Sequence, residues 1–283
     1  MREGSAATLA RLLLLPRGQG TLALGIALAV LILAASMAGP VLYGQDPFAL
    51  HPGAVLAHPQ WRFPLGTDDL GRNAMARLLV AGRSTLYVAL PAAALAFAAG
   101  TLYGLVSGFG PRLLDQVLMR LLDAVLALPG LVVLIFFGAI VPLNTPGLIL
   151  LLGLISWPSL ARLVRNETLA QRERDFIHAA RQLGAGFAHI AMTHLLRVMA
   201  PVLVVNLTFL VGDMIFALSA LSFLGLGVQP PATSWGGLLQ EGLEMIALDP
   251  WWLILPPGLM IFGAMLATSL IGQGLLARGS AAR

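Results

Sequence analysis

The amino-acid sequence predicts an all-α membrane protein with six transmembrane helices, and two observations support this fold class. Of the 283 residues, 58% are hydrophobic and 11% are charged, which is more apolar side chain than a soluble domain of this length can bury. Apolar runs that approach the roughly 20 residues needed to cross a bilayer recur along the chain. They occupy residues 21–43, 84–108, 124–141, 147–161, 200–222 and 251–275, and Asp213 is the one charged residue inside them.

Three of these helices need further justification. The first follows a tail with arginines, as a signal peptide would, but its apolar region is longer than that of a typical cleaved signal. The third and fourth come from one apolar stretch, 124–161, which must be divided because Pro142, Asn144 and Pro146 favour a tight turn in its middle. We therefore expect a permanent first helix and a turn between the third and fourth.

Arginine sets the expected orientation, because loops rich in positive charge stay in the cytoplasm. The tail 1–20, the loop 165–199 and the tail 277–283 contain arginine, whereas the segment 223–250 contains acidic residues and no basic one. Both termini are therefore expected in the cytoplasm, and residues 21–276 form the transmembrane domain. The other external segment, 44–83, runs against the rule because its arginines outnumber its acids (Arg62, Arg72, Arg77 and Arg83 against Asp46, Asp68 and Asp69).

Composition also excludes several functions. Lysine is absent and all seventeen basic residues are arginines, so the chain has no standard P-loop, whose lysine binds the phosphates of ATP. The absence of cysteine removes disulfides, thiolate metal sites and cysteine nucleophiles. A net charge of +4 is explained by basic cytoplasmic loops, and no nucleic-acid partner is expected.

The cytoplasmic loop has the pattern of a helix. Its apolar residues recur at spacings of three and four and predict one apolar stripe, which consists of Phe176, Ala180, Leu183, Phe187 and Ile190. Gly184 interrupts the stripe and permits a bend between two short helices. Such a segment either presents a surface to a partner protein or lies on the membrane as an amphipathic helix.

Three motifs in register resemble the dipeptide/oligopeptide/nickel permeases of ATP-binding-cassette (ABC) importers. The loop contains Ala179-Ala180-x-x-x-Gly184 after Asp175-Phe-Ile, and the external segments contain Pro64-Leu-Gly-Thr-Asp-Asp-Leu-Gly-Arg72 and Leu221-Ser-Phe-Leu-Gly-Leu-Gly-Val-Gln-Pro-Pro231. The shorter segments 118–123, 161–165 and 234–236 are similar too. The likeness covers residues 20–276, and the motif order resembles that of the second permease of the pair. Arg197 and Leu218 depart from the family, which often has Pro and Glu there.

The resemblance implies a type I ABC importer permease fold in a bacterial inner membrane. It implies that the chain is not an enzyme and binds no cofactor, and that ATP and Mg²⁺ are used by two partner ATPase subunits. A homologous permease subunit and an external substrate-binding protein would complete the importer for peptides, nickel chelates or related solutes. The residues expected to engage the ATPase are Asp175, Phe176, Ala179, Ala180, Leu183, Gly184 and Phe187.

Other residues are candidates for the pathway itself. Asp213 either lines the translocation path or makes a local polar contact with Asn206 or Thr208, because a carboxylate inside a membrane is costly without water or a partner. The Gly- and Pro-rich stretch 222–237 either folds back as an external gate or is a rigid turn. Its gate candidates, on the resemblance, are Ser222, Phe223, Gly225 and Gly227.

Three further patterns give expectations about packing. Gly100, Gly104 and Gly108 form a small-residue face that packs on another helix of this chain or on a partner permease. The loop histidines are not spaced as ligands on one helix face, and no metal site is expected. The tryptophans of the last external boundary are expected at the membrane interface. These side chains are His178, His189 and His194, and Trp235, Trp251 and Trp252.

One function of another class competes with the importer subunit. A proton- or ion-coupled secondary transporter would work without an ATPase and could also place one carboxylate inside the membrane. Such transporters often consist of internal repeats, and no inverted repeat is visible in this sequence. Dependence of transport on an ATPase separates the two functions.

Overall fold

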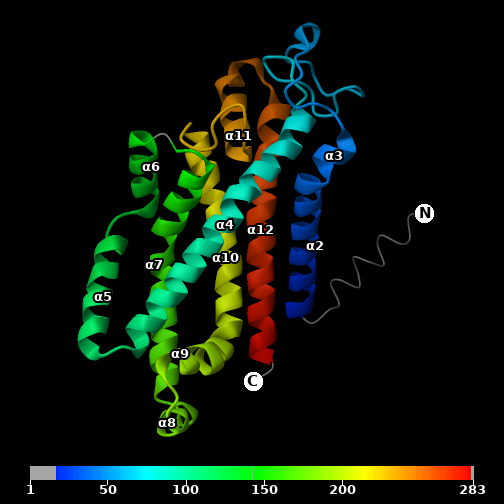
Figure 1. Cartoon of the computed structure of the whole chain (residues 1–283). Coiled ribbons are helices and arrows are strands. Elements are labelled where there is room, and N and C mark those ends of the chain that lie inside the picture. Colours follow the sequence, from blue (N-terminus) through cyan, green and yellow to red (C-terminus); the bar gives the residue numbers. More distant parts are fainter. Residues whose placement is uncertain (1–16, 142, 282–283) are drawn as a thin grey trace.

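The computed structural model describes residues 17–141 and 143–281, and within them every extended regular element is a helix (Figure 1). The described residues therefore agree with the all-α class. Arg2, Arg11, Pro142 and Arg283 lie outside them. The main helices are α2 (Arg17–Met37), α3 (Gly39–Tyr43), α4 (Ala74–Phe109), α5 (Arg112–Leu126), α6 (Gly130–Ile140), α7 (Thr145–Arg172), α8 (Asp175–Gln182), α9 (Phe187–Ile190), α10 (Leu196–Phe223), α11 (Trp235–Glu244) and α12 (Trp251–Ala281).

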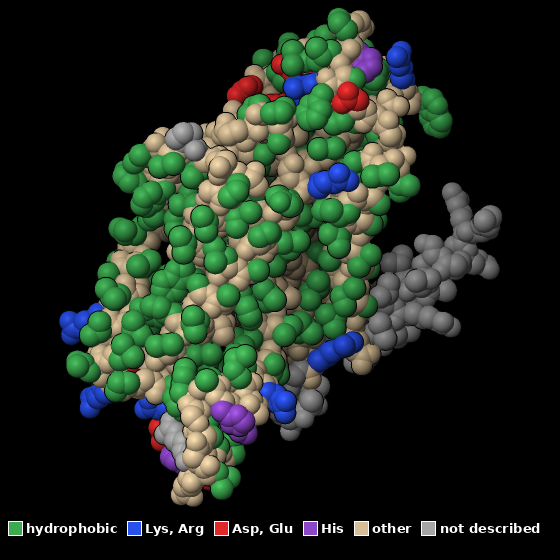
Figure 2. Space-filling model, viewed as in Figure 1, with side chains coloured by type: hydrophobic (Ala, Val, Ile, Leu, Met, Phe, Trp, Pro, Cys, Tyr) green, Lys and Arg blue, Asp and Glu red, His purple; other side chains and the backbone are tan. Residues whose placement is uncertain are grey.

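Five described helices are long and apolar enough to cross a membrane: α2, α4, α7, α12, and α10 together with the α9 turn and the π-helical turn 191–195 that precede it. The pair α5 and α6 makes a sixth crossing if it is one bent span. Figure 2 shows hydrophobic side chains over the middle of the molecule and charged ones gathered at its two ends. This distribution fits a multi-pass membrane protein.

The third span differs from the continuous helix expected at 124–141. The chain forms α5 and α6 instead, and their axes are bent by 73° at the break between them. Pro129 stands at the N-terminal cap of α6, and a proline disfavours helical geometry at the residue before it. The turn expected after it is confirmed, since α6 ends at Ile140 and Asn144 caps α7 by accepting a hydrogen bond from the Gly147 N–H at 3.0 Å.

Glycines bring α4 and α7 into close contact through the centre of the bundle. A Cβ atom on Gly100 would lie 2.8 Å from the Trp157 carbonyl oxygen, and one on Gly104 would lie 2.6 Å from that of Ala161. Gly108 continues the contact one turn further, beside Thr168. The small-residue face of α4 therefore packs within this chain, which is the first of the two alternatives.

The long helices connect two structured ends. At one end, residues 44–73 form a cap with α11 and the starts of α4 and α12, which we call the cap end (Figure 1). At the other end, α8 and α9 project between α7 and α10, which we call the α8 end. Because α4 begins at Ala74, the expected external segment 44–83 is helical over its last turns.

Candidate functional site

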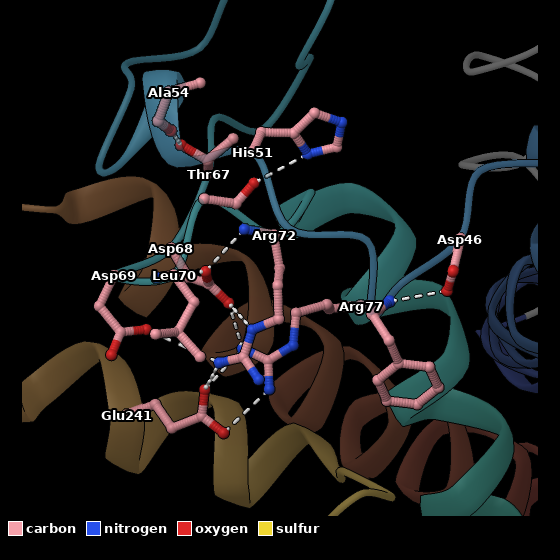
Figure 3. Close-up of polar contacts among 12 residues, drawn as sticks. Asp46, His51, Ala54, Thr67, Asp68, Asp69, Leu70, Arg72, Arg77 and Glu241 are labelled. Carbon is pink, nitrogen blue, oxygen red and sulfur yellow. Dashed lines mark hydrogen bonds and ion pairs between the residues drawn. The ribbon is translucent and has the colours of Figure 1, made fainter.

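The motif at residues 64–72 builds the centre of the cap around one buried carboxylate. Asp68 is 2% exposed, and its Oδ1 accepts hydrogen bonds from the backbone N–H groups of Leu70 and Arg72 at 3.0 and 2.8 Å. Its Oδ2 accepts from Arg72 Nε at 2.6 Å and from an Arg77 guanidinium nitrogen at 2.7 Å (Figure 3). Asp68 therefore fixes the loop and the first turn of α4 together.

The two glycines of this motif are required by the backbone. Gly66 and Gly71 have φ angles of 64° and 74°, in the left-handed region that favours glycine. A Cβ on Gly66 would also lie 2.5 Å from the Ala57 carbonyl oxygen, and one on Gly71 would collide with the His51 carbonyl oxygen. The motif is thus a folded turn whose spacing delivers Asp68 and Arg72 to the same site.

Glu241 on α11 completes the cluster from a distant part of the chain. Its two carboxylate oxygens accept from the Arg77 guanidinium at 2.6 and 2.9 Å, and Arg72 lies 3.5 Å away (Figure 3). Arg72 and Arg77 are thereby neutralised by Asp68 and Glu241. Two of the four arginines of the segment 44–83 thus have a structural role in the cap.

Two tryptophans expected at the membrane interface lie in the interior instead. Trp235 is 0% exposed: its backbone N–H donates to Thr85 Oγ1 and its indole N–H to the Leu78 carbonyl, both at 3.2 Å. Trp252 is 3% exposed and its indole N–H donates to the Thr67 carbonyl at 3.2 Å. The expectation was wrong for Trp235 because α11 folds back against α4, α10 and α12, and for Trp252 because the cap packs over the start of α12. Trp251, 50% exposed, remains on the surface.

The candidate gate residues form a tight turn at the end of α10. Gly225 has a φ of 77°, and the Leu226 N–H donates to the Leu221 carbonyl at 2.9 Å, so the helix ends in a left-handed cap. Gly227 packs directly on Ser222, where a Cβ would overlap the hydroxyl. Ser222 is 3% exposed and Phe223 is 38% exposed. The stretch therefore does fold back, and it leads into α11.

The loop at the α8 end consists of two short helices with Gly184 between them, as predicted. Gly184 has a φ of 82°, and the N–H groups of Leu183 and Ala185 donate to the carbonyls of Ala179 and Ala180 at 3.1 and 3.0 Å. A Cβ on Gly184 would meet no atom within 4 Å, so its backbone angle alone demands glycine. The Ala-Ala-x-x-x-Gly motif is thus the end of α8 and its cap.

The apolar stripe expected along this loop is corrected in part. Leu183 is 89% exposed, whereas Ile177, which lies off the expected stripe, is 0% exposed and packs in the core. Ala180 and Ile190 do face the bundle, while Phe176 and Phe187 are 37% and 41% exposed. Leu183 is exposed because α8 ends at Gln182, and within α8 the face that packs on the core includes Ile177 and Ala180 instead of Phe176. Asp175 and Ala179 are exposed.

The loop histidines have aromatic neighbours. The rings of His189 and His194 lie 5.9 Å apart at their centroids, and Phe176 lies 6.2 Å from His194. The part of the chain that the structure describes holds no group of three or more His, Asp or Glu side chains that could bind a metal.

Ion pairs join α5 to α7 at the α8 end, and the sequence pattern gave no sign of them. Arg165 holds Asp115 in a bidentate pair with distances of 2.9 and 2.5 Å, and the Ser107 hydroxyl donates to the same carboxylate at 2.6 Å. Arg162 pairs with Asp123 further along α5. The Arg162–Asp123 pair connects the segments 118–123 and 161–165, which were noted only as short motifs.

A groove of about 1040 Å³ opens between α5, α6, α7 and α10. It is lined mainly by aliphatic and aromatic side chains, and its polar lining residues are Ser156, Ser159, Asn206 and Asp213. Asn206 and Thr208 donate to carbonyls of their own helix, those of Val202 and Val205. Within the described residues neither forms a hydrogen bond with Asp213, and Asp213 lines the groove.

Comparison with known proteins gives consistent matches. A family model described as binding-protein-dependent transport system inner membrane component matches residues 100–278. A protein of Brucella suis biovar 1 named "putative peptide permease protein" is 36% identical over 253 residues, covering 89% of this chain and 83% of the relative. A di/tripeptide transport system permease protein of Pseudomonas aeruginosa is 36% identical over 261 residues, covering 89% of this chain and 84% of the relative.

Proposed function

Because the chain belongs to the family of binding-protein-dependent transport system inner membrane components, and is thus a permease subunit of an ABC importer, we propose that it forms half of a pathway for short peptides. Peptide cargo is supported by the names of its relatives in Brucella suis and Pseudomonas aeruginosa. The groove of about 1040 Å³ is the observation that carries this proposal. A homologous permease packed against α5, α6 and α10, three of the helices that line the groove, would enclose it.

The loop of α8 and α9 is the proposed docking point for an ATPase subunit. Helix α8 projects beyond the ends of the long helices (Figure 1), and Leu183, directly after α8, is 89% exposed. A protruding aliphatic side chain can act as an anchor that fills a pocket on a partner. The proposed docking residues are Asp175, Phe176, Ala179, Ala180, Leu183, Gly184 and Phe187.

ATP and Mg²⁺ would be bound by two ATPase subunits, because this chain has no lysine for a P-loop. The chain itself is proposed to be non-catalytic. Closure of the ATPases would pull on α8 and move the long helices as rigid bodies.

We place the α8 end and both termini in the cytoplasm and the cap end outside, where a substrate-binding protein would dock. The arginines near the α8 end support this orientation. Arg72 and Arg77 at the cap end are held in ion pairs with Asp68 and Glu241, so their presence there has a structural reason. The turn with Ser222, Phe223, Gly225 and Gly227 then lies at the outer end of the groove wall formed by α10. This position makes it the candidate external gate.

The experiment that tests this function is reconstitution. The chain, its partner permease, the ATPases and the binding protein are placed in proteoliposomes, and uptake of labelled tri-alanine is measured with ATP and with a non-hydrolysable analogue. Uptake is expected only with hydrolysable ATP and all subunits. Uptake by the chain alone under a proton gradient would favour a secondary transporter and contradict the proposal.

A further inference from the structure

The groove has a single charge, and nothing in the described structure neutralises it. Asp213 is exposed on the groove wall, and no described side chain pairs with it. The described lining residues include no arginine or histidine. An ionised carboxylate within the membrane has a high free energy unless a cation or water compensates its charge. This position therefore favours a positively charged solute in the groove.

Position along the helix places this charge inside the membrane. By the rise of 1.5 Å per residue, Asp213 lies roughly 15 Å from Phe223 at the end of α10. The hydrocarbon core of a bilayer is roughly 30 Å thick, so the carboxylate is near its middle depth. A solute that travels along the groove therefore meets Asp213 about halfway.

Other groups on the wall add acceptors to the same surface. Asn206 lies two helical turns before Asp213 on the same face of α10, a separation of roughly 10 Å. On the facing helix, Pro158 has no N–H to donate to the carbonyl of Leu154, which also lines the groove. These groups supply partial negative charge and leave Asp213 as the one full charge on the wall.

We infer that Asp213 receives the protonated amino terminus of a peptide during its passage, and so selects peptides with a free amino group. This inference rests on the proposed peptide pathway. An extended tripeptide spans roughly 10 Å, which matches the separation of Asp213 and Asn206. The ammonium group would form a charge-assisted hydrogen bond with the carboxylate, while the uncharged peptide body contacts the apolar wall.

The first test measures tri-alanine uptake by the reconstituted importer with Asp213→Asn, Asp213→Glu and, as a control, Glu244→Gln. Asp213→Asn is expected to lower uptake at least about tenfold, because it removes a charge-assisted contact. Asp213→Glu should recover most of it, and the exposed Glu244→Gln should match the parent. Melting temperature is measured in parallel, because removal of an unpaired charge from the membrane should leave the fold at least as stable.

The second test asks whether the amino group is what is recognised. Equilibrium dialysis compares tri-alanine with N-acetyl-tri-alanine on the permease–ATPase complex in nanodiscs, without the binding protein. The parent should prefer the free amine by at least about tenfold, and Asp213→Asn should erase that preference. The same preference in both proteins overturns the inference, as does parental tri-alanine uptake by Asp213→Asn. If the parent importer takes up neither peptide, the proposed peptide function fails as well.

Discussion

The guanidinium of Arg77 at the start of α4 forms a bidentate ion pair with Glu241 on α11, at 2.6 and 2.9 Å, across 164 positions of the chain. The same guanidinium contacts Asp68 of the cap at 2.7 Å. One side chain therefore ties together three segments that are far apart in the sequence. The cap, α4 and α11 are expected to move as one unit.

The first prediction concerns this ion cluster. Arg77→Gln removes the buried cation that Asp68 and Glu241 share and leaves Asp68, which is 2% exposed, with Arg72 as its ion-pair partner; loss of this one partner should cost about 1–3 kcal/mol. Glu241→Gln should cost less, because Glu241 is 36% exposed and water can replace part of the contact. The melting temperatures of the two purified variants in detergent should fall in that order. Equal melting temperatures would show that the cluster does not stabilise the cap.

The second prediction concerns the contact between α4 and α7. Gly104→Ala places a Cβ 2.6 Å from the Ala161 carbonyl oxygen, and overpacking of this kind costs about 1–3 kcal/mol. Gly258→Ala on α12 is the matched control, because a Cβ there meets no atom within 4 Å. Thermal unfolding should separate the two variants. A melting temperature for Gly104→Ala at or above that of Gly258→Ala would contradict the close packing.

These two contacts differ in how far the sequence could predict them. One helix face contains Gly100, Gly104 and Gly108, so their four-residue period alone indicated close packing against another helix. The period could not show whether that other helix belongs to this chain or to a partner permease. Arg77 and Glu241 carry no such local signal, because their meeting depends on how α11 folds back. For the same reason Trp235 was misplaced, since the rule for interfacial tryptophans describes a chain that leaves the membrane.

The errors inside helices have a physical cause as well. The stripe from Phe176 to Ile190 was extrapolated beyond Gln182, where α8 ends ahead of the left-handed turn at Gly184, so Leu183 lies outside the helix that the stripe assumed. The third span was assigned from the length of its apolar run. That length contains no information on the direction of the helix axis, so the bend before Pro129 was missed. Asp213, by contrast, could be identified from the sequence, because a lone charge in an apolar run has few acceptable surroundings.

The third prediction concerns Leu218, where the resemblance leads one to expect glutamate. Leu218 is 0% exposed in the core around α10. Leu218→Glu would bury an unpaired carboxylate and should destabilise the chain by roughly 3 kcal/mol, whereas Leu218→Met keeps volume and polarity and should cost less than about 1.5 kcal/mol. Denaturant titration of both variants in detergent checks this. A Leu218→Glu variant as stable as Leu218→Met would reveal a polar environment around this position.

The fourth prediction concerns ATPase docking. Leu183 is 89% exposed, so Leu183→Asp should leave the fold intact while it removes the proposed anchor. Truncation of an anchor costs about 2 kcal/mol or more, so affinity for the ATPase subunits should fall roughly thirtyfold, with a matching loss of ATP-driven uptake. Leu50→Asp is the control for ATPase affinity, because Leu50 is 60% exposed in the cap at the opposite end of the molecule. Ile177→Asp should instead unfold the loop, because Ile177 is fully buried. Affinity is measured by pull-down titration with the purified ATPases. If the Leu183→Asp variant binds them as tightly as the parent protein does, α8 is not the docking point.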